Sequence, residues 1–402
     1  MNDSFNINWS TSQGRAELQR ISNVLNISLP RSYTEQKAWA IDVVEKVNGN
    51  FALKTTSADA FSGELAGISK SQRNRSLSVG PLPSYIPQYE KETDVLSVAI
   101  ARFELNDVKV LALFNLGFVF FDSKNRVLEE ISSQYYPLLA LHPNLNQILS
   151  SGEHHVDTST FIADWFFERN YAHWLLDSIP RLLNREGKVV CHKPEKVWQK
   201  ELLAIYGVTT DDIVSIEPNS CFSFERLLVD GKNSSPVPHP SYKCHTSAIE
   251  FIRSPIGSTV EVQSKSKVAL VIKRFDSRVI VNSLQIEELL TQLGYVVQII
   301  DCAEVAVATQ IRCFAQADVV VGAHGAAMAN TSFCKPGAMV FEVFPPCYGN
   351  PAFWAVSNSV GVKYIAVTDV EEVSDESKKA RYRNIKLQES SLTHLEKILT
   401  SE

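Results

Sequence analysis

Short apolar runs alternate with helical patterns through the last third of this chain, and that alternation constrains its fold more than any other feature. The runs that predict strands cover residues 268–272, 295–300, 318–321, 339–343 and 363–367. Helical spacing fills residues 283–293 and 305–315 between them. Strands that alternate with helices are typical of a parallel sheet covered by helices. The sequence therefore predicts an α/β fold for this part of the chain.

The same alternation also occupies residues 158–216, so a second α/β unit is expected there. At 402 residues the chain exceeds what one hydrophobic core usually supports. We therefore expect two lobes, an N-terminal domain over residues 1–255 and a C-terminal, Rossmann-like domain over residues 256–402.

The N-terminal domain is expected to contain a β-rich section. Aromatic and β-branched runs at residues 95–105, 108–113 and 117–121 are separated by Asn-Asp and Asn-Leu-Gly, a pattern that predicts an antiparallel meander near residues 95–131. Residues 1–92 show little regular pattern beyond a predicted helix over residues 34–47. No role is assigned to them.

Composition argues against several classes of protein. A net charge of −6 lacks the basic excess of a nucleic-acid-binding protein. The seven cysteines are scattered, so neither a disulfide framework nor a zinc site is indicated, and a reducing, cytoplasmic environment is expected. The first ten residues lack a signal-peptide pattern, and no apolar run reaches the roughly 20 residues of a spanning helix. Any membrane contact is therefore expected to be peripheral.

A turn rich in glycine and alanine follows the predicted strand at residues 318–321. It contains Gly322, His324, Gly325 and Ala326. Small residues let a ligand approach the amides at a helix N-terminus, where the partial positive charge favours anions such as a diphosphate. Ligands of open parallel sheets also bind at the carboxyl ends of strands. The simpler interpretation is that the glycines only allow tight packing and that His324 makes a structural hydrogen bond.

Two further strand ends carry charged residues that would complete such a site. Arg274 and Arg278 follow the strand at 268–272, and their forked donors suit phosphate oxygens. Glu342 stands near the end of the strand at 339–343, where a carboxylate can accept hydrogen bonds from ribose hydroxyls. Each of these has an ordinary alternative, as a solvated loop residue or strand end. Together with the turn they predict a nucleotide-binding site.

A second candidate site lies in the N-terminal half. His173 and Asp177 are four residues apart, so on a helix their side chains share one face. An imidazole and a carboxylate placed in this way can act as a general base and its orienting partner. The alternative is an ordinary helix-face network in which Asp177 pairs with Arg181.

At residues 170–183, 273–282 and 317–345 the sequence resembles glycosyltransferase family 61. The matching residues include Asn170-Tyr171-Ala-His173-Trp174, Lys273-Arg274 and Gly322-Ala-His324-Gly325-Ala326. The resemblance implies a GT-B-like fold, in which two Rossmann-like lobes enclose a cleft. It also implies an inverting glycosyltransferase that requires no metal and no cofactor beyond its nucleotide-sugar donor.

The same resemblance assigns roles to the candidate residues. Asp177 or His173 would take the proton of the acceptor. Arg274, Arg278, Gly322, His324, Gly325, Ala326 and Glu342 would hold the nucleotide sugar, for which a UDP-linked donor is expected. The acceptor would be a glycan or a lipid-linked glycan in bacterial polysaccharide biosynthesis, such as that of a capsule.

Two other classes of function stay open at this point. One is a nucleotide-dependent α/β enzyme, such as an NAD-dependent oxidoreductase, although the turn lacks the G-x-G-x-x-G spacing that such an enzyme would use. The other is a carbohydrate-binding protein that keeps the fold without the chemistry.

Overall fold

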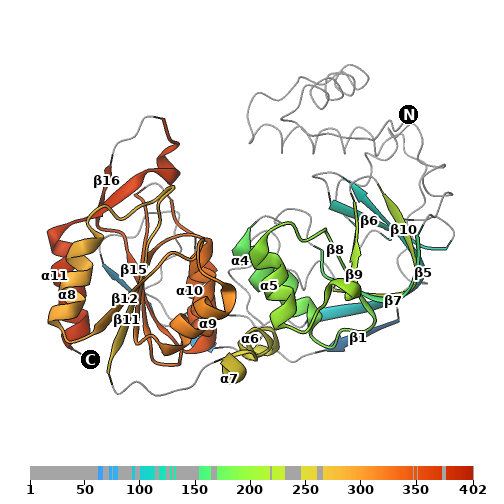
Figure 1. Cartoon of the computed structure of the whole chain (residues 1–402), viewed down its shortest axis with the longest axis horizontal. Coiled ribbons are helices and arrows are strands. Elements are labelled where there is room, and N and C mark those ends of the chain that lie inside the picture. The colour runs from blue at the N-terminus through green and yellow to red at the C-terminus, as the bar shows by residue number, and fades with distance from the viewer. Residues whose placement is uncertain are drawn as a thin grey trace.

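The structure, a computed structural model, describes residues 62–66, 72–74, 76–79, 93–95, 100–132 and 154–401, the last two ranges with internal gaps of which 231–245 is the longest. Two sheets lie towards opposite ends of the molecule, with helices between them (Figure 1). The predicted helix at residues 34–47 lies outside the described residues. Nowhere in the described part of the chain is a helix both long and apolar enough to cross a membrane.

The C-terminal sheet has six parallel strands in the order β12-β11-β13-β14-β15-β3. Five of them are β11 (Val268–Ile272), β12 (Val296–Ile300), β13 (Val319–Ala323), β14 (Met339–Val343) and β15 (Lys363–Val367), which confirms the five predicted strands. The sixth, β3 (Ser76–Val79), pairs with β15 and comes from the region assigned to the N-terminal domain. The division of the chain at residue 255 stays a prediction.

Apolar side chains cover both faces of this sheet, as expected for buried parallel strands. Leu270 and Val320 pack on one face with α9 (Val307–Gln316), the 3-10 helix η6 (Ala326–Phe333) and α10 (Ala352–Val360). Val271 and Val321 pack on the other face with α8 (Ser283–Gln292) and α11 (Glu389–Thr400). A small antiparallel pair, β16 (Val370–Val373) and β17 (Asn384–Leu387), adjoins the second face.

The N-terminal sheet is mixed and has seven strands. Its order is β1-β5-β10-β7-β8-β9, with β6 paired to β5. The strands are β1 (Ser62–Ala66), β5 (Ile100–Leu113), β6 (Gly117–Phe121), β7 (His154–Phe161), β8 (Lys188–Cys191), β9 (Ile213–Ser215) and β10 (Cys221–Asp230). The last four in the order are parallel, which agrees with the predicted second α/β unit.

The meander differs in detail from the prediction. Asn106-Asp107 was expected to form a turn, but β5 runs through it as one strand. Asp107 takes up the left-handed conformation with φ of 51°, and pairing with β10 keeps the same register on both sides of it. Because β10 pairs with β5 on both sides of Asp107, from Arg102 to Leu111, tertiary pairing outweighs the local turn preference. β5 and β6 pair as antiparallel neighbours, with Leu113 opposite Gly117, and residues 115–116 of the second predicted turn lie outside the described residues.

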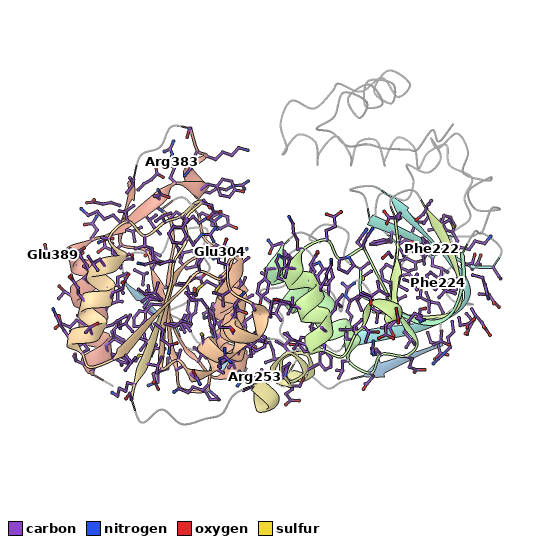
Figure 2. The ribbon with its side chains drawn as sticks, in the orientation of Figure 1. Phe222, Phe224, Arg253, Glu304, Arg383 and Glu389 are labelled. Atoms are coloured by element: carbon purple, nitrogen blue, oxygen red, sulfur yellow. The ribbon has the colours of Figure 1, made fainter. Side chains whose placement is uncertain are left out.

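The two halves share one hydrophobic core. Trp174 and α5 (Val197–Ile205) from the N-terminal half belong to the same buried cluster as Leu270 and Val320. Polar contacts lie at the same junction. Arg253, at the end of α6 (Thr246–Arg253), donates to the carbonyl of Ser332 near the end of η6 and to that of Cys334 just after it (Figure 2). The N-terminal helices therefore have a fixed place against the C-terminal sheet.

Candidate active site

β11 and β13 end side by side at the point where the strand order of the C-terminal sheet reverses. The chain passes from β11 to β12 on one side and returns to β13 on the other. In open α/β sheets, ligands bind in the crevice outside the strand ends at such a point. Lys273 and Arg274 follow β11 there, and His324 and Gly325 follow β13. The fold thus brings together two loops that are distant in sequence.

The two candidate glycines provide space, since neither has a φ in the left-handed region. A Cβ on Gly325 would lie 2.0 Å from Nη1 of Arg274, and one on Gly322 would lie 2.9 Å from Cδ1 of Ile272. Gly325 also precedes η6, which begins at Ala326. The opening amides of a helix have no partner within the helix. Arg274 therefore lies against the start of η6, where an anion would meet both a guanidinium and backbone amides.

Arg278 is 9% exposed and is held from several sides. Its Nε donates to the carbonyl of Arg381 and its Nη1 to the carbonyl of His324, both at 2.8 Å. The guanidinium also lies over the rings of Tyr348 and Tyr382, at 5.0 and 5.3 Å from their centroids. These contacts fix the group beside the turn after β13.

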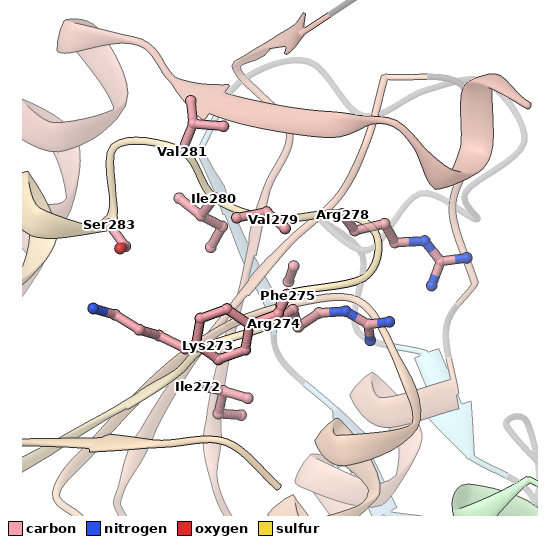
Figure 3. A pocket seen from close by; sticks show the side chains of 10 residues that line it. Ile272, Lys273, Arg274, Phe275, Arg278, Val279, Ile280, Val281 and Ser283 are labelled. Carbon is pink, nitrogen blue, oxygen red and sulfur yellow. The ribbon is translucent and has the colours of Figure 1, made fainter. Parts of the chain in front are cut away.

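Arg274 and Arg278 extend their guanidinium groups to the same side of the loop that follows β11 (Figure 3). Arg274 pairs with Asp276 at 3.2 Å and donates to the carbonyl of Ser277. Nη1 of Arg274 makes no hydrogen bond to any described residue, and neither does Nη2 of Arg278. Burial lowers the pKa of Arg278, and the charge of Arg274 lowers it further. A bound anion would stabilise both cations and accept from their remaining donors.

A pocket of about 280 Å³ opens beside these arginines at the end of β11. Apolar side chains form most of its wall, among them Phe275, which is 76% exposed. Lys273 and Ser283 lie towards one end of the pocket and the two guanidinium groups at the other (Figure 3). Glu287 pairs with Lys273 at 3.1 Å. The pocket therefore offers an apolar middle with polar groups at both ends.

His324 belongs to a buried hydrogen-bonded chain that crosses three neighbouring strands. Its Nδ1 lies 2.5 Å from Oε1 of Glu342, and the hydroxyl of Tyr364 donates to Oε2 of Glu342 at 2.5 Å. His324 is 5% exposed, Glu342 0% and Tyr364 1%. Phe344, Tyr348 and Phe353 surround the imidazole at centroid distances of 5.1 to 5.3 Å. The ring is fixed in both position and orientation.

The hydrogen bonds from His324 and Tyr364 change the role expected for Glu342. The sequence placed it at an open strand end, where it could accept from ribose hydroxyls. The structure buries it completely, and each carboxylate oxygen already accepts from a protein group. A buried carboxylate needs such partners because desolvation penalises its charge. Glu342 contacts His324 and Tyr364, so any effect on a ligand is transmitted through His324.

His173 and Asp177 form the predicted pair, with Nδ1 and Oδ2 2.7 Å apart. The helix that carries them is irregular. Residues Tyr171–His173 are α-helical (α4), Trp174–Ser178 form a π-helix (η2) and Ile179–Leu182 form a 3-10 helix (η3). Pro180 cannot donate to a helical ladder, which accounts for the change after Ser178. Short π-helices are frequent at functional sites.

A second hydrogen-bonded chain connects this helix to the turn after β13. The hydroxyl of Tyr171 donates to Oδ1 of Asn330 in η6 at 2.6 Å. Asn330 is fully buried and donates in turn to Gln310 at 2.8 Å. Tyr171 precedes His173 by two residues, so the chain ties the two candidate regions together.

The residues that hold the candidate side chains in place could not be identified from sequence patterns. Tyr364 lies within the predicted strand at 363–367, and Asn330 lies four residues beyond Ala326, so neither was assigned a role. Tyr348, which contacts both His324 and Arg278, follows Pro345-Pro346, a pattern that signals a turn and no chemistry. Trp174, next to His173, is buried and packs against Trp198, so it is part of the core.

Among the described residues, one group has the spacing of metal ligands: His155, Asp157 and Glu225. The three residues are exposed and lie on β7 and β10, in the N-terminal sheet. Exposed groups of this kind are common without an ion. The group includes none of the candidate site residues.

The family model described as Glycosyltransferase 61 matches residues 171–341. This region includes every candidate site residue except Glu342, which follows it directly. No curated protein matches the chain. Among solved structures, the chain is similar to the bacterial iron-containing dodecameric glycosyltransferase TibC from enterotoxigenic E. coli H10407, with 11% identity, a TM-score of 0.29, and coverage of 74% of this chain and 82% of that chain. The family match supports a glycosyltransferase.

Proposed function

We propose that this protein is a glycosyltransferase of family 61 that moves a sugar from a nucleotide-sugar donor to a glycan acceptor. One observation carries the proposal: Arg274, Arg278 and the start of η6 converge at the switch point of the C-terminal sheet. Guanidinium groups and helix-start amides are the groups that proteins use for diphosphates. The convergence lies inside the region that the family model matches.

The donor would extend from the arginines into the pocket at the end of β11. The pocket, of about 280 Å³, falls at the small end of ligand pockets, so it would take only the nucleoside part of the donor. Its apolar wall suits a planar base. Lys273, a donor without acceptor capacity, suits a base with carbonyl oxygens, such as the uracil of a UDP-sugar.

The His173–Asp177 pair would act on the acceptor. A carboxylate that orients an imidazole is an effective general base for a hydroxyl. One displacement at the anomeric carbon, assisted by one base, inverts the configuration of that carbon. In this scheme the cations of the C-terminal half bind the diphosphate without a metal ion.

Other parts of the proposal rest on the resemblance to family 61. They are a GT-B-like cleft between the lobes, an acceptor that is a growing or lipid-linked glycan of a capsule or similar polysaccharide, and a cytoplasmic enzyme with at most peripheral membrane contact. The domain limits, 1–255 and 256–402, belong to the same proposal.

A thermal-shift screen of UDP-, dTDP-, GDP- and CMP-sugars tests the proposal. A ligand that binds only the folded state raises the melting temperature by mass action. We expect a UDP-sugar to stabilise the protein and the Arg274→Ala variant to lose that effect. If no nucleotide sugar stabilises the protein, or if Arg274→Ala binds as well as the wild type by calorimetry, the proposed donor site is wrong.

A further inference from the structure

The environment of His324 goes beyond what a nucleotide contact requires. Its Nδ1 is taken by Glu342, and Glu342 is in turn held by Tyr364, so two buried groups serve one imidazole. In the sheet, Gly322 of β13 lies opposite Glu342 of β14. His324 is two residues beyond Gly322, just after β13 ends, so its side chain falls on the same face as that of Glu342. A histidine that only packed against other residues would need neither partner.

The chain also determines which nitrogen of His324 is available. Because an ionised Glu342 accepts hydrogen bonds only, Nδ1 of His324 carries a proton and donates it. Nε2 then remains for a ligand. Nε2 makes no hydrogen bond to any described residue, and it is not fully buried. The imidazole therefore reaches the surface through Nε2.

The surroundings of His324 are cationic. Its own carbonyl accepts from Arg278, and the ring of Tyr348 contacts both its imidazole and the guanidinium of Arg278. The next residue, Gly325, lies against Arg274. An anion bound by the two arginines would thus lie close to the imidazole, and a protonated imidazole paired with Glu342 would add a further positive charge beside that anion.

We propose, on the basis of the glycosyltransferase function proposed above, that His324 is a catalytic residue that donates its Nε2 proton to the leaving diphosphate, and that Glu342 and Tyr364 are its positioning residues. In this step the bond between the anomeric carbon and the β-phosphate oxygen breaks, and its electron pair stays on that oxygen. The acceptor oxygen forms the new bond to the anomeric carbon, and its proton goes to the His173–Asp177 pair. The Nε2 proton stabilises the oxygen that gains the negative charge.

The test separates binding from turnover. Dissociation constants are measured by calorimetry for the sugar donor that the thermal-shift screen identifies, and kcat is measured as release of nucleoside diphosphate from that donor. For His324→Gln we expect kcat to fall about 10²- to 10⁴-fold. For Glu342→Gln we expect a fall of about 10- to 100-fold, and for Tyr364→Phe a smaller one, because these side chains act through the imidazole. The Kd for this sugar donor, measured by calorimetry without acceptor, should change less than about threefold in all three variants, which is within about 0.7 kcal/mol, because the oxygen that His324 stabilises gains its charge only when the bond to the sugar breaks.

Matched controls are His394→Gln and Glu396→Gln, both on the exposed side of α11. Equal losses in donor affinity and kcat for His324→Gln would show that His324 only binds, and unchanged kcat would show that it has no catalytic role; both results overturn the proposal. If Glu342→Gln does not fold, Tyr364→Phe decides about the positioning chain, because it removes one hydroxyl and keeps the ring. Failure of the wild type to bind UDP or to turn over any donor would instead contradict the glycosyltransferase function itself.

Discussion

Two histidine–carboxylate pairs carry the chemistry in the function proposed above, and they differ in how they are built. His173 and Asp177 are four residues apart on one irregular helix, with side chains 19% and 3% exposed. His324 directly follows β13 and Glu342 lies on the neighbouring strand β14, 18 residues further along the sequence, and their side chains are 7% and 0% exposed. In both pairs the carboxylate holds Nδ1. The first pair is thus more open to solvent, and the second is enclosed beside two arginines.

In the proposed reaction, this difference suits the two pairs to opposite ends of the transfer. A base for an incoming acceptor must be reachable from solvent before the acceptor binds. A group that assists the leaving diphosphate must lie beside the cations that bind it, and its orientation must be fixed in advance. The His173–Asp177 pair meets the first requirement and the His324–Glu342 pair meets the second.

The largest expected effect comes from breaking the more exposed pair. Asp177→Asn keeps the shape of the side chain but removes the charge that orients and stabilises the imidazole. We expect kcat to fall about 10²- to 10⁴-fold, with unchanged UDP affinity, because Asp177 belongs to the acceptor side. Steady-state kinetics and calorimetry measure the two quantities. Asp211→Asn, in an exposed position, is the control, and equal losses in both quantities would contradict the assignment.

The next largest effect concerns the cations beside the enclosed pair. Arg278→Gln removes the charge near the diphosphate, and charge-assisted hydrogen bonds contribute about 1.5 to 3 kcal/mol each. We therefore expect the Kd for UDP to rise about 10- to 100-fold in calorimetry. Arg312→Gln, on the outer side of α9, should bind UDP as the wild type does. Normal affinity of Arg278→Gln would remove Arg278 from the site.

A smaller loss is expected where the glycine turn makes room for Arg274. In Gly325→Ala the new methyl group would lie 2.0 Å from Nη1 of Arg274, so the guanidinium must move away from the start of η6. We expect about a tenfold loss in UDP affinity, equivalent to about 1.4 kcal/mol, with a folded protein by circular dichroism. Gly257→Ala, where a methyl group meets nothing within 4 Å, is the matched control. Wild-type affinity of Gly325→Ala would show that Arg274 reaches the ligand from another position.

The two pairs also show what the sequence could and could not predict. His173 and Asp177 were predicted as a pair because helical spacing is local and places both on one face. Arg274, Arg278 and the turn at Gly322–Ala326 were predicted as one site because strand ends of a parallel sheet meet at one edge. Glu342 was given a different role because its partner, Tyr364, comes from the next strand. Register and facing direction across strands are tertiary properties that no spacing within one segment reveals.

The smallest expected effect tests whether the two regions are coupled through Tyr171 and Asn330. Tyr171→Phe leaves Oδ1 of Asn330 buried without its donor, which costs about 1 to 3 kcal/mol of unfolding free energy. Because the bond anchors the helix of His173 to η6, we expect kcat to fall a few fold while UDP affinity stays unchanged. Denaturant unfolding and steady-state kinetics measure the two effects. Tyr206→Phe, which removes a comparable hydroxyl bond to the carbonyl of Ile252, is the control for loss of stability alone. If both variants lose stability and neither loses turnover, the bond from Tyr171 to Asn330 stabilises the fold without setting the position of the His173–Asp177 pair.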